Sequence, residues 1–440
     1  MQADLTTIQD LSIFERDEQF SVFHFLDQTK TIGGREWLES YFKKPLATLE
    51  DIHQTQALLK KFTAVSHQWP DDISNGTIMV VEKFYQSGIS GLPERPTIIN
   101  AFSYKIFNVS DYSIIRYSVK YFIQLIRGMH EIDLLLNGND NPLILQKLLN
   151  EVALLLKSPG IDEIKKLDYK EKLSRVKILF FANYFLHQYK SACFTLIQLF
   201  YRFDGYMSMA LAGEKFHFSY PIFYDDPWPH FEAKELFHPL LKIPVAYPIN
   251  ISHEKNFLFL TGANMSGKST FIKAVGVAAY LAHLGMAVPA ASLRLSFFDG
   301  LLSNIQVADN IVKGESYFFN EVQRIKSTII KISNGKKWLI LIDELFKGTN
   351  IEDAMRCSTV VIEGLLKMKN ALFILSTHLY EIAETLQHFP NIFFHYFETN
   401  IENGRLVFNY QLKPGVSVDK LGYLILKNEG VVELLDHIKV

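Results

Sequence analysis

The sequence has few cysteines, and this scarcity excludes two classes of site. Two cysteines in 440 residues, Cys193 and Cys357, cannot build a disulfide framework or a cysteine-based zinc site. We interpret both as buried thiols in a reducing compartment. The first 20 residues are charged throughout and contain no apolar segment typical of a signal peptide. These features favour a cytoplasmic protein.

The sequence also lacks an excess of charge of either sign. Its 45 basic and 47 acidic residues give a net charge of −2, so no overall positive field indicates nucleic acid as a partner. Local lysine pairs such as Lys43-Lys44 and Lys336-Lys337 remain, although each pair alone is more typical of a solvated helix surface. DNA binding would therefore depend on a local patch.

Long apolar runs are absent as well. The most apolar stretch, residues 178–203, is interrupted by His187, Lys190 and Arg202. A membrane-spanning helix needs about 20 mostly apolar residues, so a buried or amphipathic helix fits this stretch better. We expect no membrane partner.

The pattern of apolar residues divides the chain into two regions with different predicted secondary structure. Residues from about 20 to 235 repeat apolar residues at helical spacing, and prolines cluster between Pro221 and Pro248. Beyond this cluster apolar strands at 257–261, 338–342 and 371–376 alternate with helical segments. We predict an α + α/β protein, with an all-helical domain at 1–235 and an α/β domain with a mostly parallel sheet at 236–440.

A glycine-rich segment follows the first of these strands. It fits the GxxxxGK[ST] phosphate loop and opens a predicted helix, which is the context that makes such a match specific. Glycines let backbone N–H groups face the phosphates, and the start of the helix adds partial positive charge. We expect Lys268 to reach the β- and γ-phosphates of ATP, and the Ser269 hydroxyl to bind Mg²⁺. The predicted nucleotide-binding residues here are Gly262, Ala263, Asn264, Met265, Ser266, Gly267, Lys268, Ser269 and Thr270.

Two later strands end in residues suited to hydrolysis. The strand at 338–342 runs into Asp343 and Glu344, at the sheet edge where open α/β folds bind ligands. Asp343 would hold Mg²⁺ and Glu344 would polarise the attacking water. The strand at 371–376 leads to His378, which can contact the γ-phosphate or its water. Lys268, Glu344 and His378 are therefore the predicted catalytic residues.

A further anion-binding element lies between these motifs. Gly314-Glu-Ser316 precedes a predicted helix at 319–330. A serine at the start of a helix can bind phosphate or simply cap the helix, and the residues alone leave both readings open.

Taken together, these segments resemble the MutS mismatch-repair family. Residues 261–270, TGANMSGKST, are similar to the family's TGPNMxGKST, and 309–321 to its DDLxxGxSTFxxE. Residues 343–350, DELFKGTN, are similar to DEIGRGTS, and 376–378 to its ATH. Residues 237–239 and 26–46 are similar to the entry of the family's ATPase domain and the start of its core. The likeness is strongest from 237 to 378.

The resemblance implies a helical core and lever domain followed by an ABC-type ATPase domain. Two copies would form a homodimer with composite ATP sites, in which Ser316 acts on the partner's nucleotide. His395, in a segment similar to the family's Asn-Val-His, would lie near the adenine. DNA is the expected substrate, with downstream repair proteins as further partners, and ATP would open and close the levers on it.

The chain also departs from the family pattern. Ala263 stands for a proline, Tyr317 for a threonine and Phe346-Lys347 for Gly-Arg. Because the core-like segment starts near residue 20, we expect a short form without the mismatch-binding and connector domains. Two alternatives stay open: an ABC- or SMC-like ATPase that binds DNA structures in recombination, and a nucleotide-gated protein scaffold.

Overall fold

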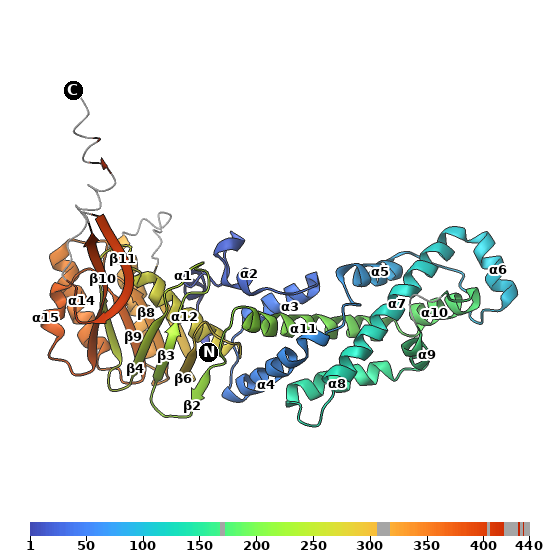
Figure 1. Cartoon of the computed structure of the whole chain (residues 1–440), viewed down its shortest axis with the longest axis horizontal. Coiled ribbons are helices and arrows are strands. Elements are labelled where there is room, and N and C mark those ends of the chain that lie inside the picture. The colour runs from blue at the N-terminus through green and yellow to red at the C-terminus, as the bar shows by residue number, and fades with distance from the viewer. Residues whose placement is uncertain (168–171, 306–316, 403–404, 418–429, 432–433, 435–440) are drawn as a thin grey trace. The chain divides into compact units, whose positions relative to one another are not determined.

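The described part of the chain forms two compact units. The computed structural model describes residues 1–167, 172–305, 317–402, 405–417, 430, 431 and 434. A helical unit comprises 26–44 and 53–215, and a sheet unit comprises 1–25, 45–52 and the described residues from 216 onward (Figure 1). The predicted domain boundary between residues 235 and 236 stays a prediction. No helix in these ranges is long and apolar enough to cross a membrane.

The helical unit is built around the 28-residue helix α7 (Val109–Leu136). Its buried residues include Ile115, Val119, Phe122 and Ile126, spaced three or four apart so that they share one face. Phe122 stacks on Phe185 of α10 at 4.1 Å between ring centroids. The other helices here are α3 (Ile32–Phe42), α4 (Leu49–Val65, from His53 on), η2 (Ser66–Gln68), α5 (Asn75–Gln86), α6 (Ile98–Phe107), α8 (Leu143–Leu156), α9 (Ile161–Lys166), α10 (Arg175–His187) and α11 (Lys190–Lys215).

Helices α3 and α11 cross at glycines. A Cβ on Gly205 of α11 would lie 2.2 Å from the Trp37 ring, and one on Gly33 of α3 would lie 2.2 Å from the Tyr201 ring. Asp204, the buried residue before Gly205, accepts hydrogen bonds from the Thr31 backbone N–H (2.8 Å) and hydroxyl (2.6 Å). The close approach of the two helices therefore requires residues without a side chain at these points.

The sheet unit contains a seven-stranded sheet whose neighbours are parallel except for the last pair. Its order is β1-β7-β8-β9-β5-β10-β11, and only β10 and β11 run antiparallel. The mostly parallel sheet and the predicted strands at 257–261, 338–342 and 371–376 are confirmed, the second extending to Asp343. The strands are β1 (Gln2–Ala3), β5 (Phe257–Thr261), β7 (Gly300–Asn304), β8 (Trp338–Asp343), β9 (Ala371–Ser376), β10 (Ile392–Glu402) and β11 (Arg405–Pro414).

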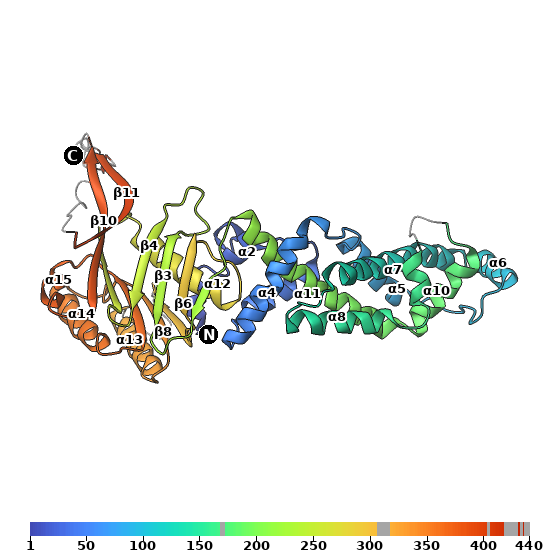
Figure 2. The same ribbon diagram turned by 60° about the horizontal axis from the view of Figure 1, so that its bottom comes forward.

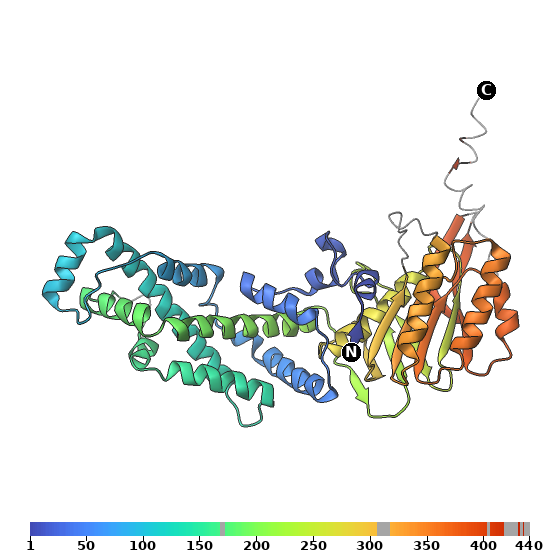
Figure 3. The same ribbon diagram turned by 180° about the vertical axis from the view of Figure 1, so that it is seen from behind.

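Helices cover both faces of this sheet. Ile340 and Ile342 of β8 belong to a buried cluster with residues of α13, α14 and α15, the orange helices in front of the sheet in Figure 3. Leu341, which points the other way, lies under α12, where a Cβ on Gly276 would be 2.7 Å from it. The helices of this unit are α1 (Leu5–Asp10), η1 (Glu18–Phe20), α2 (Val22–Leu26), α12 (Lys268–His283), α13 (Tyr317–Ile332), α14 (Ile351–Leu365) and α15 (Glu381–Leu386).

A smaller four-stranded sheet packs in the same unit. Its order is β2-β6-β3-β4, with β2 and β6 parallel and the other pairs antiparallel. Figure 2 shows β4, β3 and β6 side by side. These strands take up much of the proline-rich stretch, where the chain becomes extended. Their bounds are β2 (Ile222–Tyr224), β3 (His230–Leu236), β4 (Tyr247–Ser252) and β6 (Ser292–Ser296).

The N-terminal residues are part of the sheet unit. Gln2 and Ala3 pair with β7 as strand β1, which is too short for a sequence pattern to predict. Asp10, buried at 2% exposure, accepts hydrogen bonds from the Ser303 hydroxyl (2.6 Å) and the Ile305 N–H (2.9 Å). The start of the chain thereby completes the β7 edge of the sheet, more than 290 residues away in sequence.

Candidate nucleotide site

The three strands that carry the predicted motifs end side by side. Leu260 of β5 pairs with Ser376 of β9, and Ser376 also pairs with Asp343 of β8. The carboxyl ends of the three parallel strands therefore meet at one edge, where open α/β sheets bind ligands. The Ser376 hydroxyl also donates a hydrogen bond to the Asp343 carboxylate.

The phosphate loop has the backbone conformation that its glycines predict. Gly262 and Gly267 have φ of 142° and 107°, values that side chains disfavour. A Cβ on Gly262 would lie 2.9 Å from the Ser266 Oγ, so a side chain there would crowd the loop. Met265 is also left-handed, at φ 67°, and is 72% exposed. The helix α12 begins at Lys268, directly after the loop.

Lys268 is a buried cation inside this loop. Its side chain is part of a residue only 6% exposed, and its Nζ donates to the carbonyls of Gly262 (2.8 Å) and Ala263 (2.9 Å). Burial lowers the pKa of Lys268, while the carboxylates of Glu344 and Asp343 oppose that shift. A desolvated ammonium at the start of a helix has a strong electrostatic preference for an anion.

Glu344 lies between two basic side chains. Its carboxylate is 3.3 Å from Nδ1 of His378 and 3.2 Å from Nζ of Lys347. The hydrogen bond to His378 and the charge of Lys347 lower the pKa of Glu344 to about 2, against the opposing effect of burial. The same hydrogen bond raises the pKa of His378. Lys347 was not among the predicted site residues, although it follows Glu344 by one short turn.

Lys268 and Glu344 border a cavity of about 400 Å³ beside the loop. Seven of its lining residues belong to the predicted set, from Asn264 in the loop to Glu344 at the end of β8. The rest form an apolar and aromatic wall that sequence reasoning missed, because they come from the chain before β4, the first residue of β4 and β11. The wall consists of Leu241, Ile243, Val245, Tyr247 and Tyr410.

The donor set fits Mg²⁺ held together with nucleotide phosphates. Such a site takes one or two protein carboxylates and completes its octahedron with phosphate oxygens and water. Asp343 offers the carboxylate and Ser269 the hydroxyl, at the end of β8 and the start of α12. Within the described ranges, the buried Ser266 hydroxyl makes no hydrogen bond, which leaves a polar group for a ligand in the loop.

A comparison with known families matches this part of the chain. The family model described as MutS domain V matches residues 258–434, a range that contains the phosphate loop, Asp343, Glu344 and His378. Residues 258–434 are therefore similar to MutS domain V.

Curated proteins similar to this chain include DNA mismatch repair proteins. The MutS protein of Thermotoga maritima is 26% identical over 285 residues, which are 64% of this chain and 34% of the relative. MutS of Listeria welshimeri is 29% identical over 268 residues (59% and 31%), and mismatch repair protein MSH3 of Candida glabrata is 30% identical over 282 residues (61% and 26%). The chain thus matches about a third or less of the length of these relatives.

His395 lies away from the cavity, and Ser316 lies outside the described structure. His395 sits in β10 beside Leu260 of β5, and it is not among the described residues that line the cavity. Burial lowers the pKa of His395, and its Nδ1 has no hydrogen-bond partner within the described ranges. Ser316 lies outside the described residues, as does Gly314.

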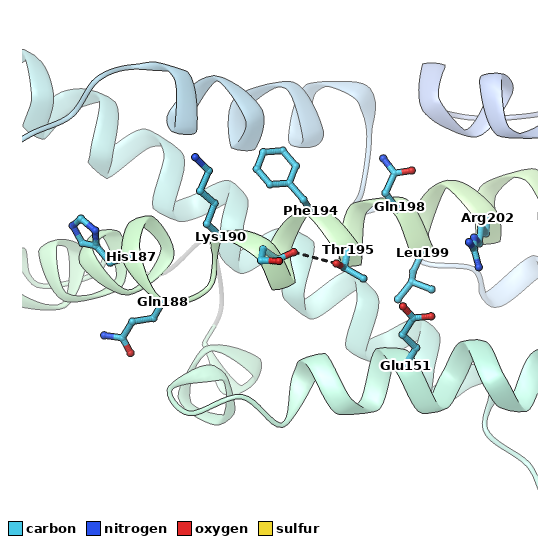
Figure 4. A pocket seen from close by; sticks show the side chains of 10 residues that line it. Glu151, His187, Gln188, Lys190, Phe194, Thr195, Gln198, Leu199 and Arg202 are labelled. Atoms are coloured by element: carbon cyan, nitrogen blue, oxygen red, sulfur yellow. Dashed lines mark hydrogen bonds between the residues drawn. The ribbon is translucent and has the colours of Figure 1, made fainter.

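The helical unit has two surface hollows lined by charged side chains. Figure 4 shows the first, of about 680 Å³, where Lys190 and Arg202 of α11 and His187 of α10 share a groove with Glu151 of α8. The second, of about 810 Å³, lies between α6, α7 and the start of α10, and none of the described residues that line it is acidic. We call it the basic groove, after its five cationic side chains Lys105, Arg116, Lys120, Lys172 and Arg175.

Proposed function

We propose that the protein binds ATP in the domain V cavity and hydrolyses it to ADP and phosphate. The observation that carries this proposal is that buried Lys268 lines the same cavity as Glu344, whose carboxylate contacts His378. Lys268 would turn from its loop carbonyls to the β- and γ-phosphates, which satisfy its charge better than neutral oxygens. Mg²⁺ bound by Ser269 and Asp343 would neutralise phosphate charge. The apolar wall would hold the base.

The carboxylate of Glu344 is the candidate general base. It would accept a proton from water as the water oxygen bonds to the γ-phosphorus and the bond to the β-phosphate oxygen breaks. His378 orients that carboxylate through their 3.3 Å contact. A γ-phosphate would compete with Glu344 for the positive charge of Lys347, which would release the carboxylate towards the water.

ADP production by the Glu344→Gln variant tests this assignment. The amide cannot accept the proton, so we expect ATP binding to persist and turnover to fall ~10²-fold or more. Glu384→Gln, an exposed change on α15, is the matched control and should turn over like the wild type. Normal turnover in Glu344→Gln would contradict the role of Glu344, and no turnover in the wild type would favour a nucleotide-gated scaffold.

We further propose that two copies close on ATP in an ABC-type arrangement, with Ser316 of one copy capping the nucleotide of the other. The support is the resemblance of residues 309–321 to the family segment. Light scattering should then show a larger or more compact species when Glu344→Gln protein receives ATP. Mixing Lys268→Ala with Ser316→Arg chains should leave at most one intact site in each pair. Unchanged scattering with ATP would contradict the composite site.

DNA is the proposed substrate of the helical unit, because the similar proteins named above are DNA mismatch repair proteins. The basic groove supports this, because clustered lysine and arginine bind phosphates without reading sequence. A competition titration at fixed salt should compare matched, G·T-mismatched and branched duplexes. A preference for the mismatch above ~10-fold, about 1.4 kcal/mol, would favour mismatch repair, and a preference for branched DNA would favour a recombination role.

A further inference from the structure

A buried carboxylate on α13 is outside the predicted site. Glu321 is 2% exposed and lies one and three turns before Ile325 and Ile332, which are buried on the same helix face. The helical pattern would place an apolar residue there. A carboxylate in such a position needs hydrogen-bond donors that compensate for the loss of water.

Those donors are two consecutive backbone N–H groups of the loop that follows β8. One carboxylate oxygen of Glu321 accepts from Lys347 N at 3.1 Å, and the other accepts from Gly348 N at 3.2 Å. The loop also packs closely on the start of α13, since a Cβ on Gly348 would lie 2.7 Å from the Phe318 backbone N. Glu321 therefore ties residues 347 and 348 to α13 by both of its oxygens.

The tied loop is strained at the residue that faces the cavity. Glu344 and Phe346 are non-glycine residues in the left-handed region, with φ of 66° and 59°. Such conformations persist only where the surroundings hold them. At one end, Glu344 N donates to Ser376 O at 2.9 Å. At the other end, Glu321 holds Lys347 and Gly348, so the backbone between the two anchors has little freedom.

We propose that Glu321 is a positioning residue for Glu344. It keeps the loop after β8 in the strained conformation that directs the Glu344 carboxylate into the cavity, and it touches neither nucleotide nor water itself. This inference rests on the proposed ATP hydrolysis. A carboxylate is required because two N–H donors need two acceptor oxygens, whereas a glutamine would turn its NH₂ group against one of them.

The test is a double-mutant cycle between Glu321→Gln and Glu344→Gln, with ATP affinity and kcat measured separately. We expect Glu321→Gln to keep its ATP Kd within about threefold and to lose about tenfold or more in kcat, because the loop no longer holds the base. In the Glu344→Gln background, Glu321→Gln should not lower kcat any further, since no base remains to be positioned. Glu352→Gln, an exposed carboxylate on α14, is the control and should leave kcat unchanged.

Several outcomes would overturn the proposal. A folded Glu321→Gln protein with wild-type kcat would do so, as would an equal kcat loss in both backgrounds or a parallel loss of ATP affinity. If Glu321→Gln does not fold, Gly348→Ala displaces the same loop from its other side, and wild-type kcat in that variant would contradict the inference. Wild-type protein without turnover would instead contradict the proposed hydrolysis, so the two failures are distinguishable.

Discussion

The two units of the chain differ in where their backbone is strained. Among the described residues, all seven non-glycine residues with positive φ lie in the sheet unit, and three of them, Met265, Glu344 and Phe346, belong to the loops at the candidate site. The positive-φ residues of the helical unit are the glycines Gly88, Gly91 and Gly160. Strained side-chain-bearing residues tend to gather at functional sites, so the backbone conformation supports the proposal that the sheet unit carries the chemistry.

The candidate functional surfaces of the two units also differ in how many residues form them. In the sheet unit the candidate site consists of a few loop residues at strand ends that gather around a cavity. In the helical unit the candidate nucleic-acid surface is a groove whose cations come from α6, α7 and the chain before and within α10. Single changes should therefore abolish a function of the first unit and only weaken a function of the second.

The largest effect is expected from Lys268→Ala. The phosphates lose their main side-chain countercharge, so ATP should bind more than ~100-fold weaker, about 2.7 kcal/mol. Fluorescent-nucleotide titration measures this, and Lys273→Ala, farther along α12, is the control. DNA binding without nucleotide should stay unchanged in both variants. If Lys268→Ala kept its ATP affinity, a single change would not abolish a function of the sheet unit, and the contrast with the helical unit would be lost.

Packing of the helical unit should respond to Gly205→Ala. The new methyl group would meet the Trp37 ring, 2.2 Å from the ideal Cβ position, and overpacking of this kind costs about 1–3 kcal/mol. Gly364→Ala on α14 of the sheet unit is the matched control, because nothing lies within 4 Å of its Cβ. That change should stabilise the protein by about 0.5–1 kcal/mol. Denaturant unfolding compares the two, and equal effects would refute the close crossing of α3 and α11.

Charge reversal in the basic groove should have a moderate effect. Each of Lys105→Glu and Arg175→Glu removes a phosphate contact, so the slope of log K against log salt should become shallower by about one unit per residue. DNA titrations at several salt concentrations measure the slope. Lys336→Glu, on an exposed turn of the sheet unit, is the control. An unchanged slope in the groove variants would exclude this groove as the DNA surface.

The smallest effect concerns the titration of His378. The Glu344 carboxylate raises the pKa of His378 above its ordinary value of 6.5, so Glu344→Gln should lower it. The contribution of the His378–Glu344 pair to the free energy of unfolding is complete below pH 6.5. It is lost as the pH rises through the raised pKa of His378. Imidazole NMR titration, assigned with His378→Gln, measures the change. An equal His378 pKa in wild type and Glu344→Gln would contradict the pair.

The strands and helices of the sheet unit could be predicted because each is marked by a pattern within its own segment of the sequence. The strands β5 and β9 match the predicted ranges to the residue, and α13 extends the predicted helix at 319–330 by two residues at each end. Unbroken apolar runs identify buried parallel strands without reference to the rest of the chain. The helical unit was predicted only as helices, because helical spacing indicates which face is buried but not which helix covers it.

The sequence by itself determined the phosphate loop, since its strand, glycines, lysine and helix start are contiguous and their conformations follow from glycine geometry. It also determined that Asp343 and Glu344 follow a buried strand. Only the tertiary structure decided that Glu321 binds the loop after β8, that Tyr410 borders the cavity and that Gln2 pairs with Gly300. These contacts join distant parts of the chain, and their partners are chosen by the order of strands and the packing of helices, which no local propensity encodes.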